Sequence, residues 1–118
     1  MTTQQHSENN WVDICALSDI PPNSGVCADL NGEQVAIFHL KSSSSNQVKA
    51  VSNFDPFSRA NILSRGLVTE TDNNHFVASP LLKQQFCLTT GQCEQDDSMS
   101  ITTYQVRLTG ELVQLREA

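Results

Sequence analysis

The sequence predicts an all-β domain, with small antiparallel sheets arranged as a sandwich or barrel. Short apolar runs alternate with turn-forming residues along the whole chain of 118 residues, as in proteins built from short strands. No segment offers the helical periodicity that about twelve residues would need to show. A chain of this length fits one compact domain. We therefore expect a disordered polar tail over residues 1–10 and a single domain over residues 11–118.

The strands are expected in order between recognisable turns. Trp11–Cys15 alternates apolar and polar side chains, as a strand with one buried face should. Asn31-Gly32 lies between two apolar runs and is the strongest hairpin signal in the chain, because both residues accept a positive φ. Asp72–Asn74 marks a second hairpin, and Gly110 separates the last two strands. The expected strands span residues 11–15, 25–30, 33–40, 47–52, 66–69, 75–79, 85–88, 101–108 and 111–115.

Two longer segments between these strands, Asn53–Gly66 and Ser79–Gln85, are rich in turn formers and show no helical stripe. In a small β domain two such loops can meet at one tip and form a two-sided site. Asp55-Pro56 is a plausible turn start, where the carboxylate accepts hydrogen bonds from backbone N–H groups two or three residues on.

The order of strands and loops resembles a Rieske-type ferredoxin domain, from about residue 11 to residue 115. The landmarks are WVDIC, LSRG, FCLTTG, and YQVRL followed by GELVQL. Three stretches, SNFDPF, ILSRGL and ASPLLKQQF, are similar to the small subunits of cytoplasmic, assimilatory NADH-dependent nitrite reductases. The resemblance implies one partner, a large catalytic subunit that carries siroheme, an iron–sulfur cluster and FAD. By the same resemblance, that subunit takes electrons from NADH and reduces nitrite to ammonium.

The chain departs from the Rieske family at the ligand positions. A Rieske [2Fe–2S] centre is held by two cysteines and two histidines, in the family as C-x-H in the first loop and C-x-x-H in the second. The first pair falls on Asn53 and Asp55, and the second falls on Ser79 and Leu82. None of these is a thiol or an imidazole, so we expect this chain to bind no cluster and no other cofactor. We expect Asn53 and Ser79 to join the two loops by hydrogen bonds, and Leu82 to fill the space of an iron atom.

No other metal site is expected. The cysteines are scattered rather than paired as CxxC, and without an export signal the cytosol would keep them reduced; they are Cys15, Cys27, Cys87 and Cys93. Cys15 and Cys87 lie in apolar alternation and are expected to act as small hydrophobes, although a disulfide between Cys87 and Cys93 is a geometrically possible alternative. The histidines share no local spacing of the kind that metal ligands need; they are His6, His39 and His75.

The charge distribution indicates a protein-binding surface. The formal net charge is −6, which argues against binding to nucleic acid or an anionic membrane. A secretory leader and a long apolar run are both missing, so a cytoplasmic location is expected. Yet Pro56–Thr69 and Asn73–Cys93 contain no Asp or Glu. Arginines and aromatic residues are favoured at interfaces, and the partner-binding candidates are Phe54, Phe57, Arg59, Arg65 and Lys83. The alternative is that both phenylalanines belong to the core and the charges serve solubility.

Catalysis by the chain alone is not expected, because it contains no phosphate loop, dinucleotide fingerprint or nucleophile–base pair. Ser64-Arg65-Gly66 could present backbone N–H groups to an anion such as nitrite, but such a turn more often needs its glycine for a positive φ. Together with the resemblance to nitrite reductase small subunits, this favours a non-catalytic accessory subunit of nitrite reductase. The alternatives are an electron-transfer ferredoxin, against which the missing ligands count, and a stand-alone protein- or ligand-binding module that has kept only the fold.

Overall fold

The computed structural model describes residues 10–42 and 45–117, so the expected N-terminal tail lies almost entirely outside the described residues. The prediction of an all-β fold is confirmed. A six-stranded antiparallel sheet has the order β1-β11-β10-β4-β3-β2. Its strands are β1 (Val12–Ala16), β2 (Ser24–Leu30), β3 (Glu33–Lys41), β4 (Asn46–Ser52), β10 (Thr103–Thr109) and β11 (Leu112–Arg116).

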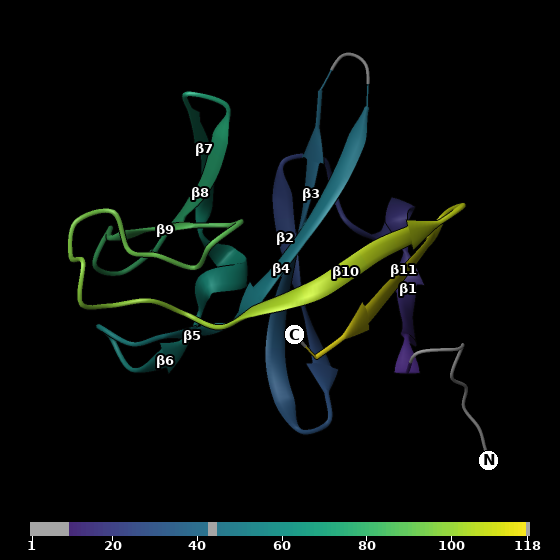
Figure 1. Ribbon diagram of the computed structural model, residues 1–118, viewed down its shortest axis with the longest axis horizontal. Coiled ribbons are helices and arrows are strands. Elements are labelled where there is room, and N and C mark those ends of the chain that lie inside the picture. Colours follow the sequence, from purple (N-terminus) through teal and green to yellow (C-terminus); the bar gives the residue numbers. More distant parts are fainter. Residues whose placement is uncertain (1–9, 43–44, 118) are drawn as a thin grey trace.

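The chain between β4 and β10 forms a second part of the molecule, on one side of the large sheet (Figure 1). It begins with a two-stranded hairpin and a 3-10 turn and continues into a three-stranded sheet of order β7-β8-β9. Its elements are β5 (Phe54–Asp55), β6 (Ala60–Asn61), η3 (Leu63–Arg65), β7 (Leu67–Thr71), β8 (Asn74–Ala78) and β9 (Gln85–Cys87). Both predicted loops belong to this part.

The turn residues explain two of the hairpins. Leu30 pairs with Glu33 across the β2–β3 turn, and the two turn residues have φ values of 53° at Asn31 and 86° at Gly32, as a tight two-residue hairpin requires. The β7–β8 hairpin has the same form, with Asp72 and Asn73 at φ values of 53° and 68°. Its turn is one residue shorter than the sequence indicated, because Asn74 already belongs to β8.

Strand β3 separates two hydrophobic clusters. Val35 and Ile37 pack into the cluster enclosed by the large sheet and the 3-10 turn η2 (Leu17–Asp19). Ala36 and Phe38 point the other way, into the cluster shared with the second part of the molecule. Burial on both faces explains why the strand reads as a nearly continuous apolar run rather than an alternating one.

The hydrophobic cluster shared with the second part of the molecule supports the two loops. Leu63 of η3, Val77 of β8 and Phe86 of β9 are all fully buried in it. The Phe57 ring packs on Phe86, with 6.0 Å between the ring centroids. The loops therefore extend from a well-packed support. Within the described ranges, no helix has the length and apolar character needed to cross a membrane.

Candidate functional site: the two-loop tip

The two predicted loops meet through one short hydrogen bond between buried side chains. Ser79 Oγ donates to Asp55 Oδ2 at 2.6 Å, and both residues are essentially inaccessible, at 1% and 0% exposure. The predicted role of Ser79 in joining the loops is thus confirmed. Its partner, however, is Asp55, for which the sequence predicts only a local turn.

That local turn is also present. Asp55 Oδ1 accepts a hydrogen bond from the Phe57 N–H at 2.9 Å, and Oδ2 accepts a second bond from Ser58 Oγ at 2.9 Å. Both oxygens of the carboxylate are therefore occupied by donors of the protein. A carboxylate that accepts three hydrogen bonds is stabilised at a buried position where an unpartnered one would be very costly.

Asn53 is buried too, but it does not reach the second loop. Its Nδ2 donates to Gln34 Oε1 at 3.1 Å, and its Oδ1 accepts from the Ser64 N–H at 2.6 Å. Asn53 therefore ties the first loop to β3 and to the 3-10 turn η3. The expectation that Asn53 joins the two loops is wrong, because its amide is used up by these nearer partners.

The two loops are built on the same plan. In the first loop, the Arg59 N–H donates to the Asp55 carbonyl at 2.7 Å, and in the second the Lys83 N–H donates to the Ser79 carbonyl at 3.1 Å. Ser79 Oγ also accepts the N–H groups of Leu81 and Leu82, at 3.3 Å each. Each loop is thus a five-residue turn that starts at a buried polar residue and ends at a cation. The two starting residues are bonded to each other.

Leu82 does not fill an iron-sized space. Its side chain is 48% exposed, so the sequence-based expectation is wrong. The direct bond between Asp55 and Ser79 joins the loops, and Leu82 lies outside that bond on the turn. The neighbouring Leu81 is 62% exposed, which the sequence did not predict.

The predicted partner-binding residues divide into two groups. Phe54, at 37% exposure, and the side chains of Arg59, Arg65 and Lys83 are exposed. Phe57 is only half-buried, but its ring packs against the core at Phe86. Of the two phenylalanines, Phe57 therefore belongs mainly to the core and Phe54 to the surface.

The three residues Ser64-Arg65-Gly66 do not form an anion nest. All three N–H groups have acceptors within the protein: Asn53 Oδ1 for Ser64, the Ile62 carbonyl for Arg65 and the Leu63 carbonyl for Gly66. Gly66 also has an extended φ of −76° rather than a positive one. A glycine is needed there for a different reason, since a Cβ atom would lie 2.2 Å from the Ala78 carbonyl oxygen.

The described histidines are far from forming a metal site. His39 is buried in the large sheet, with its ring nitrogens against the Ile20 carbonyl and Asn46 Oδ1. His75 is half-buried, and its Nε2 lies 3.9 Å from Glu70 Oε1. His6 lies outside the described residues. In the part of the chain that the structure describes, no three His, Cys, Asp or Glu side chains are grouped as metal ligands would be.

All four cysteines are free thiols. Cys93 is buried, whereas Cys15 and Cys87 are only partly so, so the small-hydrophobe role suits Cys93 best. Burial raises the pKa of the Cys87 thiol, but hydrogen bonds from Thr90 and Thr89 and the charge of Lys49 together lower that pKa below its usual value. Burial raises the pKa of Cys15 and of Cys27, with nearby carboxylates adding to the effect.

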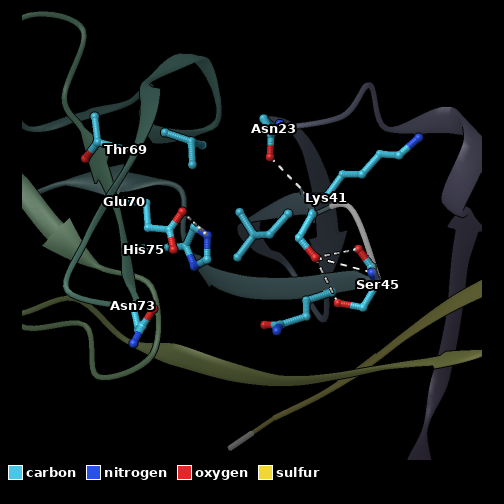
Figure 2. A pocket seen from close by; sticks show the side chains of 11 residues that line it. Asn23, Lys41, Ser45, Thr69, Glu70, Asn73 and His75 are labelled. Atoms are coloured by element: carbon cyan, nitrogen blue, oxygen red, sulfur yellow. Dashed lines mark hydrogen bonds and ion pairs between the residues drawn. The ribbon is translucent and has the colours of Figure 1, made fainter.

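A polar cleft of about 500 Å³ lies between the ends of β3 and β4 and the β7–β8 hairpin (Figure 2). Glu70 and His75 lie together on one wall, and Ser45 lies on the other. The groups on the second wall are bonded locally, with Asn23 Oδ1 accepting the Lys41 N–H and the hydroxyls of Ser42 and Ser45 bonded to each other. Among the described residues that line the cleft, the buried Thr69 Oγ1 has no hydrogen-bond partner, but one unpartnered hydroxyl does not make a catalytic site.

The tip residues do not fit a Rieske cluster. Asp55 and Asn53 have their oxygen and nitrogen atoms engaged by protein groups, Ser79 donates its proton to Asp55, and Leu82 offers no ligand atom. Thiolates and imidazoles are the ligands that such a centre uses. The tip instead presents two loops that are joined by a hydrogen bond and carry exposed cations and apolar side chains.

Comparisons with known proteins agree with this architecture. Residues 10–116 match the model of the Rieske-like [2Fe-2S] domain family. The nitrite reductase (NADH) small subunit of Escherichia coli K12 is 48% identical over 108 residues, which cover 92% of this chain and 98% of that protein. The chain belongs to the family of nitrite reductase (NADH) small subunits. The NMR structure of the E. coli protein NirD superimposes with a TM-score of 0.82, covering 92% of this chain and 96% of that one.

This chain is also similar to part of a large subunit. The nitrite reductase [NAD(P)H] large subunit of Klebsiella oxytoca contains a stretch 41% identical to this chain over 85 residues. The match covers 71% of this chain but only 8% of that large subunit. In that protein, a domain like this one is therefore part of the large polypeptide itself.

Proposed function

We propose that this chain is a non-catalytic accessory subunit of a cytoplasmic NADH-dependent nitrite reductase. In this role it binds a large catalytic subunit and supports the reduction of nitrite to ammonium without holding a cluster of its own. The large subunit is expected to carry siroheme, an iron–sulfur cluster and FAD, and to take electrons from NADH. Nitrate assimilation is the process that such an enzyme serves.

One observation carries the proposal. Of the four positions where a Rieske domain places its ligands, Asp55 and Ser79 are bonded to each other, Asn53 is bonded to Gln34 and Ser64, and Leu82 has no ligand atom. An electron-transfer ferredoxin needs a redox centre, and these side chains offer no thiolate or imidazole to hold one. The fold is thus used as a scaffold for surface contacts rather than as a cluster carrier.

The relatives support the choice of partner. The chain is similar over nearly its whole length to proteins that are small subunits of NADH nitrite reductase. A similar stretch also occurs within a large subunit. Two polypeptides that function together are often found fused in other organisms, and covalent linkage raises the effective concentration of one part for the other.

The experiment is a titration of the large subunit with this chain. Nitrite-dependent NADH oxidation and ammonium formation are measured while the purified chain, shown to be free of iron, is added to a fixed amount of the large subunit. Saturable stimulation, or saturable protection of the large subunit against inactivation, supports an accessory role. If activity and stability of the large subunit stay unchanged and no complex elutes from a sizing column, the proposal fails. A stand-alone binding module then becomes the better interpretation.

A further inference from the structure

We propose that the two-loop tip is the surface on which this chain docks to the large subunit, with Arg59 and Lys83 as paired anchors for an acidic and apolar patch. The inference rests on the proposed function, since it assumes that the partner is the large nitrite reductase subunit. It adds which face of the molecule binds, through which side chains, and what chemistry the partner must present.

The backbone at Arg59 and Lys83 is the first argument. Among the described residues, the non-glycine positions with positive φ are Asn or Asp except for these two, which have φ values of 61° and 72°. Asn and Asp tolerate the left-handed region, whereas long side chains reach it only at a cost in free energy. Glycine would fit both positions without strain. Strained residues that the surrounding structure holds in place are concentrated at functional sites.

The two five-residue turns keep Arg59 and Lys83 in the left-handed conformation. The N–H groups of Arg59 and Lys83 are bonded to the carbonyls of Asp55 and Ser79. Because the side chains of Asp55 and Ser79 are bonded to each other at 2.6 Å, the two turns that end at Arg59 and Lys83 are joined at their first residues. The backbones that carry the two cations are therefore held relative to each other, so docking has to order only the two side chains.

The charges at the tip are available to a partner. Within residues 10–42 and 45–117, no carboxylate pairs with the side chains of Arg59, Arg65 or Lys83. The only acidic residue of the two loops, Asp55, is buried. The rest of the chain is acidic, and the whole chain carries a net charge of −6. An acidic partner surface would attract the tip and repel the body, and it would thereby orient the chain tip-first.

The apolar surface lies at the same end. Four large hydrophobic side chains are exposed in the described part of the chain, and each of them lies in or directly beside the two loops: Phe54 at 37%, Leu67 at 70%, Leu81 at 62% and Leu82 at 48% exposure. Single exposed leucines are ordinary, but their concentration beside unpaired cations has the composition of an interface. Leu67 pairs with Ala78 across the β7–β8 ladder, next to Ser79 at the start of the second loop.

The large subunit is the occupant that these observations favour. The acidic body of a second copy would attract the tip by charge, but within the described residues it exposes no large hydrophobic side chain outside its own tip against which the tip leucines could pack. Tip-to-tip pairing of two copies would bring like charges together. By contrast, the K. oxytoca large subunit carries a similar domain in the same polypeptide, which places a domain of this kind at high effective concentration beside a large subunit. The partner patch should be rich in Asp and Glu around an apolar centre.

The test measures binding of the purified large subunit to immobilised full-length chain, at low and at high salt. The main variant is the double substitution Arg59→Gly with Lys83→Gly, which removes both cations and suits the left-handed backbone. We expect its Kd to rise at least tenfold while its unfolding midpoint stays the same or increases. A second variant, Leu81→Ser with Leu82→Ser, should also weaken binding at least tenfold. Lys41→Ala is the matched control, because Lys41 is an exposed cation at the far end of β3.

The outcomes separate the two proposals. Weakened binding by both tip variants, with unchanged binding by Lys41→Ala and loss of wild-type affinity at high salt, supports docking through the tip. If both tip variants bind the large subunit as tightly as the wild-type chain does, the tip is not the docking surface, but the accessory role still stands. No wild-type binding at all would overturn both. Self-association of the wild-type chain, abolished by the tip variants in sedimentation, would assign the tip to a second copy and overturn the inference.

Discussion

Removal of the Ser79 hydroxyl tests the bond that joins the two loops. In Ser79→Ala the buried Asp55 carboxylate loses one of its three hydrogen bonds. The N–H groups of Leu81 and Leu82 also lose their longer bonds to Ser79 Oγ. Water cannot replace the lost donor at a residue with 0% exposure. A hydrogen bond to a charged group contributes about 1.5–3 kcal/mol, so we expect the free energy of unfolding to fall by about 2–3 kcal/mol. For a domain of this size that corresponds to a drop in Tm of about 8–12 °C.

The assay is urea unfolding followed by the fluorescence of Trp11, the single tryptophan, which is buried in the folded chain. With a typical urea slope of about 1–3 kcal/mol per molar, the midpoint should fall by about 1–2 M. Ser98→Ala is the matched control, because Ser98 Oγ donates to Asp96 at the same distance of 2.6 Å but on the surface. Its midpoint should not change measurably. Equal effects of the two substitutions would refute the argument that burial makes the Asp55–Ser79 bond strong.

Three further predictions concern separate features of the fold. Gly66→Ala should destabilise by about 2–3 kcal/mol in the same urea assay, because the new Cβ would lie 2.2 Å from the Ala78 carbonyl oxygen; an unchanged midpoint would contradict the close approach. Cys87 should react with iodoacetamide at lower pH than Cys27, because the pKa of Cys87 is lowered and that of Cys27 is raised. Peptide mass mapping across pH 6–9 measures this order, and the reverse order would refute it. Lys83→Gly should raise stability by about 0.5–1 kcal/mol, because relief of left-handed strain outweighs the greater backbone entropy of glycine; a lower Tm in calorimetry would contradict the strain argument.

The strands and hairpins were the predictable part of this fold. Asn31-Gly32 marks its hairpin because positive φ at both positions is a local property of the two residues. Strands of five or more residues also show their alternation in the sequence. The β5–β6 hairpin and η3 were missed, since elements of two and three residues are too short to carry a period. The continuous apolar run of β3 predicted a strand, although not that it separates two clusters.

The site was predictable only where the interaction is local. The turn at Asp55 follows from the Asp-Pro pair, and the structure confirms it. The bond between Asp55 and Ser79 joins residues 24 positions apart, and no pattern in either loop specifies such a pairing. Leu82 was placed inside because it falls on a Rieske ligand position, where an apolar side chain could fill the space of an iron atom, but it is 48% exposed. Gly66 was assigned a positive φ, whereas a tertiary contact with Ala78 is the reason for its glycine.

The bond between the two loops of the tip is the central feature of the molecule. Where a Rieske domain uses metal–ligand bonds to hold two loops together, this chain uses a carboxylate and a hydroxyl with the same structural effect. The Asp55–Ser79 bond joins the two loops through protein atoms, and Phe54, Leu81 and Leu82 remain exposed beside it. The bond that joins the loops and the docking contacts that we propose involve different side chains, so Ser79→Ala should change stability and Leu81→Ser with Leu82→Ser should change binding, whereas substitution of Lys83 should change both.

The central claim is that hydrogen bonds have replaced the cluster, and reconstitution tests it most directly. The purified chain is incubated anaerobically with ferrous iron, sulfide and thiol, then desalted, and its iron, acid-labile sulfide and visible absorbance are measured. The account predicts a colourless protein with well under one iron per chain and an unchanged unfolding midpoint. Two irons and two sulfides per chain, with the absorbance of a [2Fe–2S] centre, would contradict it.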